Sequence, residues 1–116
     1  MKVAIPTDNQ GDLEDEVSFH FGRVKNYIIY DTENKKVEVL ANTSEHMGGK
    51  GLPPELLHQA GVNVMLCSSL GHRALETFNN FGIEVYCGVQ GTAGQAIKNY
   101  QDGKLDKANK DNICQH

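Results

Sequence analysis

Three histidines are candidate metal ligands, because imidazole nitrogen is the commonest metal-binding group among protein side chains. They are His20, His46 and His72, and each stands close to glycines in the chain. Their spacing matches no fixed motif such as H-E-x-x-H. The hypothesis of a shared metal site therefore requires a fold that brings the three segments together at one edge of the molecule. A fourth histidine, His58, occupies a polar helical position and is expected to face solvent.

Three cysteines, Cys67, Cys87 and Cys114, are odd in number and widely spaced. This argues against a disulfide framework and is typical of a reducing compartment. Cys67 and Cys87 end two apolar runs, where a free cysteine commonly acts as a small hydrophobe. We favour that interpretation for Cys87 and keep Cys67 as a candidate ligand. Cys114 and His116 place a thiol and an imidazole two residues apart, which by itself is a weak metal-binding signal.

Glycine-rich segments favour a negatively charged ligand with several atoms. Glycine lets backbone N–H groups approach a ligand closely, and helix N-termini attract anions through unpaired N–H groups and the helix dipole. Taken singly, each glycine is as well explained by a tight turn or a helix cap. Ligand binding is favoured only if the glycine segments converge at one edge of the molecule. The glycines concerned are Gly48, Gly49, Gly51, Gly71, Gly88, Gly91 and Gly94.

The acidic residues support a catalytic function less well than the histidines and glycines support ligand binding. The acidic run over residues 8–16 is typical of a solvated loop, and Asp31 is the one other well-placed acid. Two-metal phosphoryl transfer needs a larger set of carboxylates on the sheet. No Ser-His-Asp or phosphate-loop pattern is present either. The sequence therefore predicts a protein that is not an enzyme.

The elements that must position these residues alternate between strands and helices. Hydrophobic patterns and turn residues predict strands over residues 2–6, 25–31, 36–42, 62–67 and 83–87. Helices are predicted from Pro53 to a cap at Gly61, over residues 71–80, and from Thr92 to a cap at Gly103. Thr92 and Gln95 form a T-x-x-Q capping box at the start of the third helix.

The order βββαβαβα predicts an α/β fold of the three-layer, ribonuclease-H-like kind, with a mixed five-stranded sheet and helices on both faces. The first, fourth and fifth strands should be parallel, and residues 25–42 should add an antiparallel hairpin at one edge. In an open α/β sheet the ligand crevice lies beyond the carboxyl ends of the parallel strands. The loops over residues 7–22, 43–51, 68–73 and 88–92 should meet there.

Length and composition indicate one domain. The 116 residues, 39% of them hydrophobic, suffice for a single core, which we place in residues 1–103. Residues 104–116 are polar and unpatterned, and are predicted to form a mobile tail. The net charge is −4 and the basic residues are scattered, so no nucleic-acid partner is expected. No run approaches the ~20 apolar residues of a membrane helix, and we expect a cytoplasmic protein without membrane contact.

Four ordered segments carry a family resemblance: HFGR at residues 20–23, GGKG at 48–51, GHRA at 71–74 and GTAG at 91–94. The first is followed within eight residues by Ile29-Tyr30-Asp31. With these segments the chain resembles the dinitrogenase iron–molybdenum cofactor family, which includes nitrogenase cofactor carriers. The resemblance extends from Lys2 to Leu105.

The resemblance implies a non-catalytic domain that binds, stores or carries an iron–molybdenum cofactor, its precursor or another metal–sulfur cluster, exchanged with donor or acceptor proteins. A metal-free regulatory or protein-interaction domain on the same fold is the alternative. The resemblance and the glycine and histidine patterns together assign cluster binding to eleven residues. They are His20, Phe21, Gly22, Arg23, Gly48, Gly49, Gly51, Gly71, Arg73, Gly91 and Thr92. The candidate metal ligands are His20, His46, His72, Cys67, Cys114 and His116.

Overall fold

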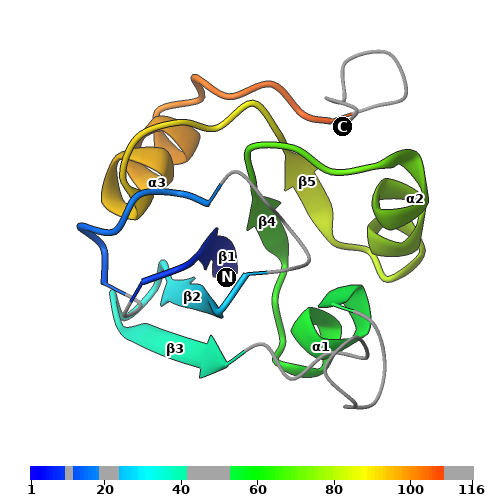
Figure 1. Cartoon of the computed structure of the whole chain (residues 1–116), viewed down its shortest axis with the longest axis horizontal. Coiled ribbons are helices and arrows are strands. Elements are labelled where there is room, and N and C mark those ends of the chain that lie inside the picture. The colour runs from blue at the N-terminus through cyan, green and yellow to red at the C-terminus, as the bar shows by residue number, and fades with distance from the viewer. Residues whose placement is uncertain (10–11, 19–23, 42–52, 109–116) are drawn as a thin grey trace.

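One mixed sheet forms the centre of the molecule (Figure 1). The computed structural model describes residues 1–9, 12–18, 24–41 and 53–108. Within these residues the strands are β1 (Lys2–Thr7), β2 (Asn26–Asp31), β3 (Val37–Ala41), β4 (Val64–Leu66) and β5 (Glu84–Tyr86), in the sheet order β3-β2-β1-β4-β5. The helices are α1 (Pro53–Gln59), α2 (His72–Asn80) and α3 (Ala93–Gln101).

Strand directions follow the predicted pattern. β1 pairs in parallel with β4, and β4 pairs in parallel with β5. β1 and β2 are antiparallel, as are β2 and β3. The β2–β3 turn is closed by hydrogen bonds from Lys35 N–H to Asp31 O at 2.8 Å and from Asp31 N–H to Lys36 O at 2.9 Å. The α/β class and the mixed five-stranded sheet predicted from the sequence are confirmed.

Alternate residues of the strands supply two hydrophobic cores, one on each face of the sheet. Val3 and Ile5 of β1 pack with Ala96 and Ile97 of α3, whereas Ala4 between them packs into the core on the opposite face. That second core also contains Leu57 of α1 and the helix α2 residues Leu75 and Phe78. Figure 1 shows the consequence, with α3 on one side of the sheet and α1 and α2 on the other.

Local residues account for the ends of the helices. Gly82 follows α2 with φ +75°, a left-handed conformation that glycine adopts without steric cost, and its N–H donates to Asn79 O at 3.0 Å. At the start of α3, the hydroxyl of Thr92 accepts the N–H of Gln95 at 3.2 Å. The predicted capping residue is thus in place.

The first residues of the predicted tail lie against the sheet. Ala108 is buried, and its N–H donates to Val85 O at 2.7 Å. Lys107 forms an isolated antiparallel β-bridge with Tyr86. Its side-chain ammonium lies 3.6 Å from the carboxylate of Glu84. Lys107 and Ala108 therefore lie along the outer edge of β5. Among the described residues, no helix is long and apolar enough to cross a bilayer.

Candidate functional site

The parallel strands β1, β4 and β5 all end at one edge of the sheet, where an α/β fold commonly binds its ligand. Three described segments continue from these ends: residues 7–9 with 12–18, residues 67–71, and residues 87–92. The first contains the acidic run, the second leads into α2, and the third leads into α3. The candidate site is built from these segments.

The start of α3 is covered by the chain itself. Residues 12–17, which we call the strap, run across it. The N–H groups of Ala93 and Gly94 each donate at 2.8 Å, to Asp15 O and to Leu13 O. The third N–H group of the helix, from Gln95, is taken by the Thr92 hydroxyl.

This arrangement changes the role expected of Gly91 and Thr92. We expected them to hold an anion through the start of α3, but the first three N–H groups of that helix already donate to protein oxygens. The carbonyl of Gly91 accepts the N–H of Val17 at 2.9 Å, so it also binds the strap. The strap is the feature that sequence reasoning missed, because its pairing uses backbone atoms and leaves the acidic side chains of Asp12, Glu14 and Glu16 exposed.

The start of α2, unlike that of α3, is not covered by hydrogen bonds from described residues. Its N-cap is Gly71, with φ −87° and ψ 170°, and no side chain caps the helix. Within the part of the chain that the structure describes, the N–H groups of Arg73 and Ala74 have no protein acceptor. No acidic residue lies in the first turn. This helix end therefore retains both the unpaired N–H groups and the positive end of the dipole that attract anions.

Two predicted site residues occupy the first turn of α2. His72 and Arg73 are both exposed. An imidazole and a guanidinium on the first turn add one potential metal ligand and one positive charge to the open helix end. Gly71, beside them, is also exposed and has free space where a Cβ would be. Gly71, His72 and Arg73 are thus the predicted site residues that the described structure brings together.

The two cysteines that follow β4 and β5 differ in exposure. Cys67 is fully buried in the core under α1 and α2, and its thiol lies 3.8 Å from the carbonyl oxygen of Tyr86. Cys87 is partly exposed. We kept Cys67 as a candidate ligand, but it is the more buried of the two and shares its core with Tyr27 and with Leu75 and Phe78 of α2. Burial, and secondarily the nearby Cys67, raise the pKa of the Tyr27 hydroxyl.

Thr7, at the carboxyl end of β1, is a candidate site residue that the sequence did not mark. It is fully buried, and its hydroxyl oxygen has no hydrogen-bond partner within the described residues. The next residue, Asp8, is exposed and accepts the hydroxyl of Ser18 at 2.7 Å. An unsatisfied buried hydroxyl costs about 1–3 kcal/mol. Its position at the edge where the parallel strands end makes it a candidate contact for a ligand.

Many predicted site residues lie outside the described residues. They share the segments around the first two predicted loops and the C-terminus, and are His20, Phe21, Gly22, Arg23, His46, Gly48, Gly49, Gly51, Cys114 and His116. Across the four described ranges, no three His, Cys, Asp or Glu side chains gather in a way that could hold a metal ion. The histidine cluster therefore stays a prediction.

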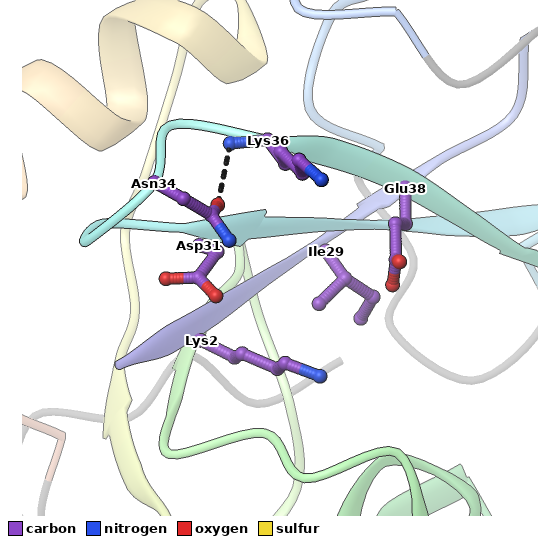
Figure 2. A pocket seen from close by; sticks show the side chains of 6 residues that line it. All are labelled: Lys2, Ile29, Asp31, Asn34, Lys36 and Glu38. Carbon is purple, nitrogen blue, oxygen red and sulfur yellow. Dashed lines mark hydrogen bonds between the residues drawn. The ribbon is translucent and has the colours of Figure 1, made fainter.

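A pocket of about 210 Å³ lies at the other end of the sheet, where β1 begins and β2 ends. Figure 2 shows its lining of two lysines, two acids, an asparagine and one apolar residue, namely Lys2, Lys36, Asp31, Glu38, Asn34 and Ile29. The mixed charges favour no single sign of ligand. The pocket is separate from the candidate site because it borders the amino end of β1.

Comparisons with known proteins bear on the identity of the domain. Residues 1–103 match the family model described as dinitrogenase iron–molybdenum cofactor. An uncharacterised protein of Methanocaldococcus jannaschii is 34% identical over 112 residues, covering 92% of this chain and 91% of that protein.

Solved structures share the fold. A Thermotoga protein described as a putative NifB protein is 36% identical, with a TM-score of 0.74 and 91% of each chain covered. The apo form of the orange protein from Desulfovibrio gigas has a TM-score of 0.80 over 92% of each chain, and at 23% identity it is similar in fold alone. From the match over residues 1–103, the chain belongs to the dinitrogenase iron–molybdenum cofactor family.

Proposed function

We propose that this protein binds a metal–sulfur cluster of the iron–molybdenum cofactor type, or a precursor of it, and carries or stores the cluster without catalytic turnover. The observation that carries the proposal is the open N-terminus of α2 at the ligand-binding edge of the sheet. Membership of the family adds the type of cargo. Clusters of this type are anionic and present several sulfur or oxygen atoms, which suit backbone N–H donors.

The described residues fit such a cargo through hydrogen bonding and charge. The N–H groups of Arg73 and Ala74 can donate to sulfide or oxo atoms, and the Arg73 guanidinium can balance negative charge. The buried hydroxyl of Thr7 supplies a further polar atom at the same edge of the sheet. A cluster bound there would be recognised by its outer atoms and by its charge.

Direct metal ligation is assigned mainly to histidine side chains, with one cysteine among the further candidates. We propose His20 as the principal ligand and His72 as a second ligand, with His46, Cys114 and His116 available from segments outside the described residues. Cys67 requires side-chain rearrangement to take part, because it is fully buried. Gly22, Arg23 and the glycines Gly48, Gly49 and Gly51 complete the proposed surroundings of the cluster.

Anaerobic reconstitution tests the proposal. The purified chain is incubated with ferrous iron, molybdate, sulfide and a reductant, separated from small molecules by gel filtration, and analysed for metals and visible absorption. We expect iron or molybdenum to remain with the protein together with charge-transfer absorption. Metal retention no higher than that of a control protein of similar charge would contradict cluster binding and favour a metal-free interaction domain.

A further inference from the structure

Cys67 and Cys87 lie opposite each other at the carboxyl ends of two neighbouring parallel strands. The last paired residues of β4 and β5 are Leu66 and Tyr86, and each cysteine is the next residue along its strand. The N–H of Cys67 donates to Tyr86 O at 3.0 Å, which is the last regular bond of this parallel ladder. Because Leu66 pairs with Tyr86 in parallel, the register of the two strands brings Cys67 beside Cys87.

Both side chains project from the same face of the sheet. Met65 and Val85, two residues before each cysteine, belong to the core under α1 and α2. Cys67 belongs to that core as well, and Cys87 packs against it. The thiol of Cys67 lies 3.8 Å from Tyr86 O, beside the peptide that joins Tyr86 to Cys87. The sulfur of Cys67 is thus already next to the backbone of its neighbour.

The backbone separation suits a covalent link. Neighbouring strands lie about 4.8 Å apart, and disulfides accept Cα separations of about 4.4–6.8 Å. Hydrogen bonds continue beyond the two cysteines, from Gly88 N–H to Ser68 O at 2.9 Å and from Val89 N–H to Cys67 O at 3.1 Å. The backbone is therefore fixed on both sides of the pair, and side-chain rotation is the main adjustment that a bond requires.

We propose that Cys67 and Cys87 form a reversible disulfide, so that the pair is a redox modification site at the base of the loops that lead into α2 and α3. Cys87 is the attacking thiol because it is partly exposed, whereas the buried Cys67 is the resolving thiol. The proposal stands on the geometry of these strands and does not depend on cluster binding.

The reaction uses a small-molecule disulfide of the glutathione class as its oxidant. Cys87 loses its proton, and its thiolate attacks one oxidant sulfur, which releases one thiol as a mixed disulfide forms. Cys67 then loses its proton, and its thiolate attacks the Cys87 sulfur and releases the second thiol. Two protein thiols are oxidised by two electrons, and one oxidant disulfide is reduced to two thiols that take up the two protons.

Peptide mapping tests the pairing, because trypsin places the three cysteines in separate peptides. Cleavage after lysine and arginine puts Cys67 in residues 51–73, Cys87 in residues 74–98 and Cys114 in residues 111–116. The reduced full-length chain is treated with oxidised glutathione, digested without reductant and analysed by mass spectrometry. We expect residues 51–73 linked to residues 74–98, in the wild type and in Cys114→Ser, and release of the link by excess reduced thiol.

Two further variants test which cysteine attacks the oxidant and which resolves the mixed disulfide. Cys67→Ala should accumulate a stable glutathione adduct on Cys87, and Cys87→Ser should leave Cys67 unmodified under native conditions. The proposal would be overturned by a stable glutathione adduct on Cys87 with Cys67 still reduced in the Cys114→Ser protein. The proposal would also be overturned if residues 74–98 linked preferentially to residues 111–116 in the wild type. The same holds if Cys67→Ala formed no glutathione adduct on Cys87.

Discussion

Gly94 lies directly against Leu13. Its N–H donates to the Leu13 carbonyl oxygen at 2.8 Å, and a Cβ atom added at Gly94 would lie 3.3 Å from that same oxygen. The contact joins the first turn of α3 to the strap across its start. The strap is further fixed by the bonds that Asp15 O accepts from Ala93 and that Val17 donates to Gly91. A small residue at position 94 is therefore part of how the chain closes this helix end.

Gly94→Ala should destabilise the protein by roughly 1 kcal/mol, although alanine favours a helix more than glycine does. The added methyl group meets a backbone oxygen held by neighbouring hydrogen bonds, so the strap cannot move away freely. The free energy of unfolding from urea denaturation measures the effect. Lys98→Ala, at an exposed position of the same helix, is the control and should change stability by less than about 0.5 kcal/mol. A more stable Gly94→Ala variant would be incompatible with a rigid strap.

Gly71→Ser should raise stability by roughly a few tenths of a kcal/mol and lower cluster retention. Serine is a better N-cap than glycine in this backbone conformation, and its hydroxyl would accept the N–H of Ala74 that we assign to the cluster. Thr92→Ala is the matched control, because it removes the cap of α3 and should cost about 1 kcal/mol without affecting retention. Urea denaturation and metal analysis on both variants check the prediction. Unchanged retention in Gly71→Ser would argue against α2 as the anion-binding helix end.

Thr7→Val should increase the free energy of unfolding by roughly 1 kcal/mol in the protein without ligand. The substitution replaces a buried hydroxyl that lacks a partner among the described residues with a methyl group of similar size. Urea denaturation again provides the measurement. If the hydroxyl also contacts the cluster, the same variant will retain less metal after reconstitution. A clear loss of stability without ligand would mean that the hydroxyl is hydrogen-bonded in solution.

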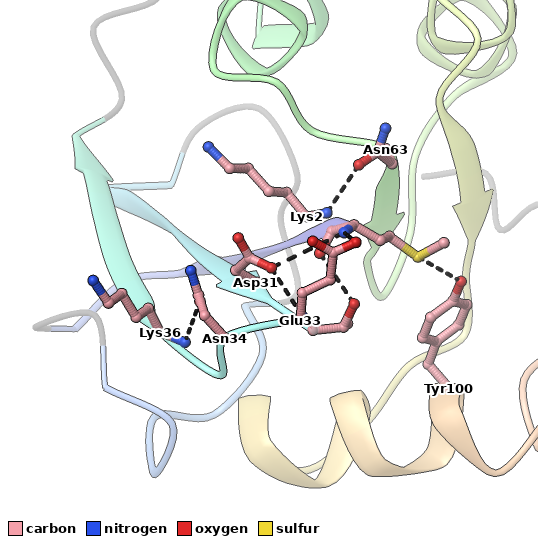
Figure 3. A network of polar contacts seen from close by, with 9 residues as sticks. Lys2, Asp31, Glu33, Asn34, Lys36, Asn63 and Tyr100 are labelled. Carbon is pink, nitrogen blue, oxygen red and sulfur yellow. Dashed lines mark hydrogen bonds and ion pairs between the residues drawn. The ribbon is translucent and has the colours of Figure 1, made fainter.

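Asp31 should make stability fall in acid. The pKa of its carboxyl group is lowered, mainly by the Glu33 N–H that donates to it at 2.9 Å (Figure 3). Desolvation is the next largest effect and opposes this, while the terminal ammonium group, Asn34 and Lys2 lower the pKa further. A lowered pKa in the folded state stabilises the protein fully above the unfolded value of about 4. That contribution is lost as pH falls through the folded-state pKa.

Asp31→Asn keeps an acceptor for Glu33 and removes the charge. We expect the variant to be less stable than the wild type at neutral pH, and the difference to shrink as the pH falls below about 4. Urea denaturation across that pH range gives the comparison. Asp106→Asn, an exposed position outside the hairpin, controls for the change in net charge. A stability difference that does not depend on pH would exclude the assigned role of the Asp31 charge.

Much of the fold was predictable because its signals are local. The apolar run over residues 62–67 predicted a strand, and Val64, Met65 and Leu66 of β4 are all buried. Thr92 and Gln95 predicted the start of α3 from side-chain chemistry alone, and the hydrogen bond between them is present. These elements follow from hydrophobic periodicity and capping, which do not require knowledge of distant contacts.

The candidate site was less predictable because it depends on contacts between distant segments. Nothing in the side chains of residues 12–17 indicates that Leu13 O and Asp15 O occupy the start of α3, since any residue type has a backbone carbonyl. The burial of Cys67 likewise depends on a core built from distant segments, which include Tyr27 of β2 and Leu75 and Phe78 of α2. The sequence could identify two helix starts at one edge of the sheet, but the tertiary structure decides which one stays open.

Metal retained per chain in two histidine variants tests the central claim most directly. His20→Ala and His58→Ala are reconstituted anaerobically in parallel with the wild type, and iron and molybdenum are measured after gel filtration. His58 is exposed and stacks on Phe81 at 4.4 Å between ring centroids, away from the ligand-binding edge. We predict that His58→Ala retains as much metal as the wild type, while His20→Ala binds roughly tenfold more weakly. Equal retention in the two variants would contradict the account.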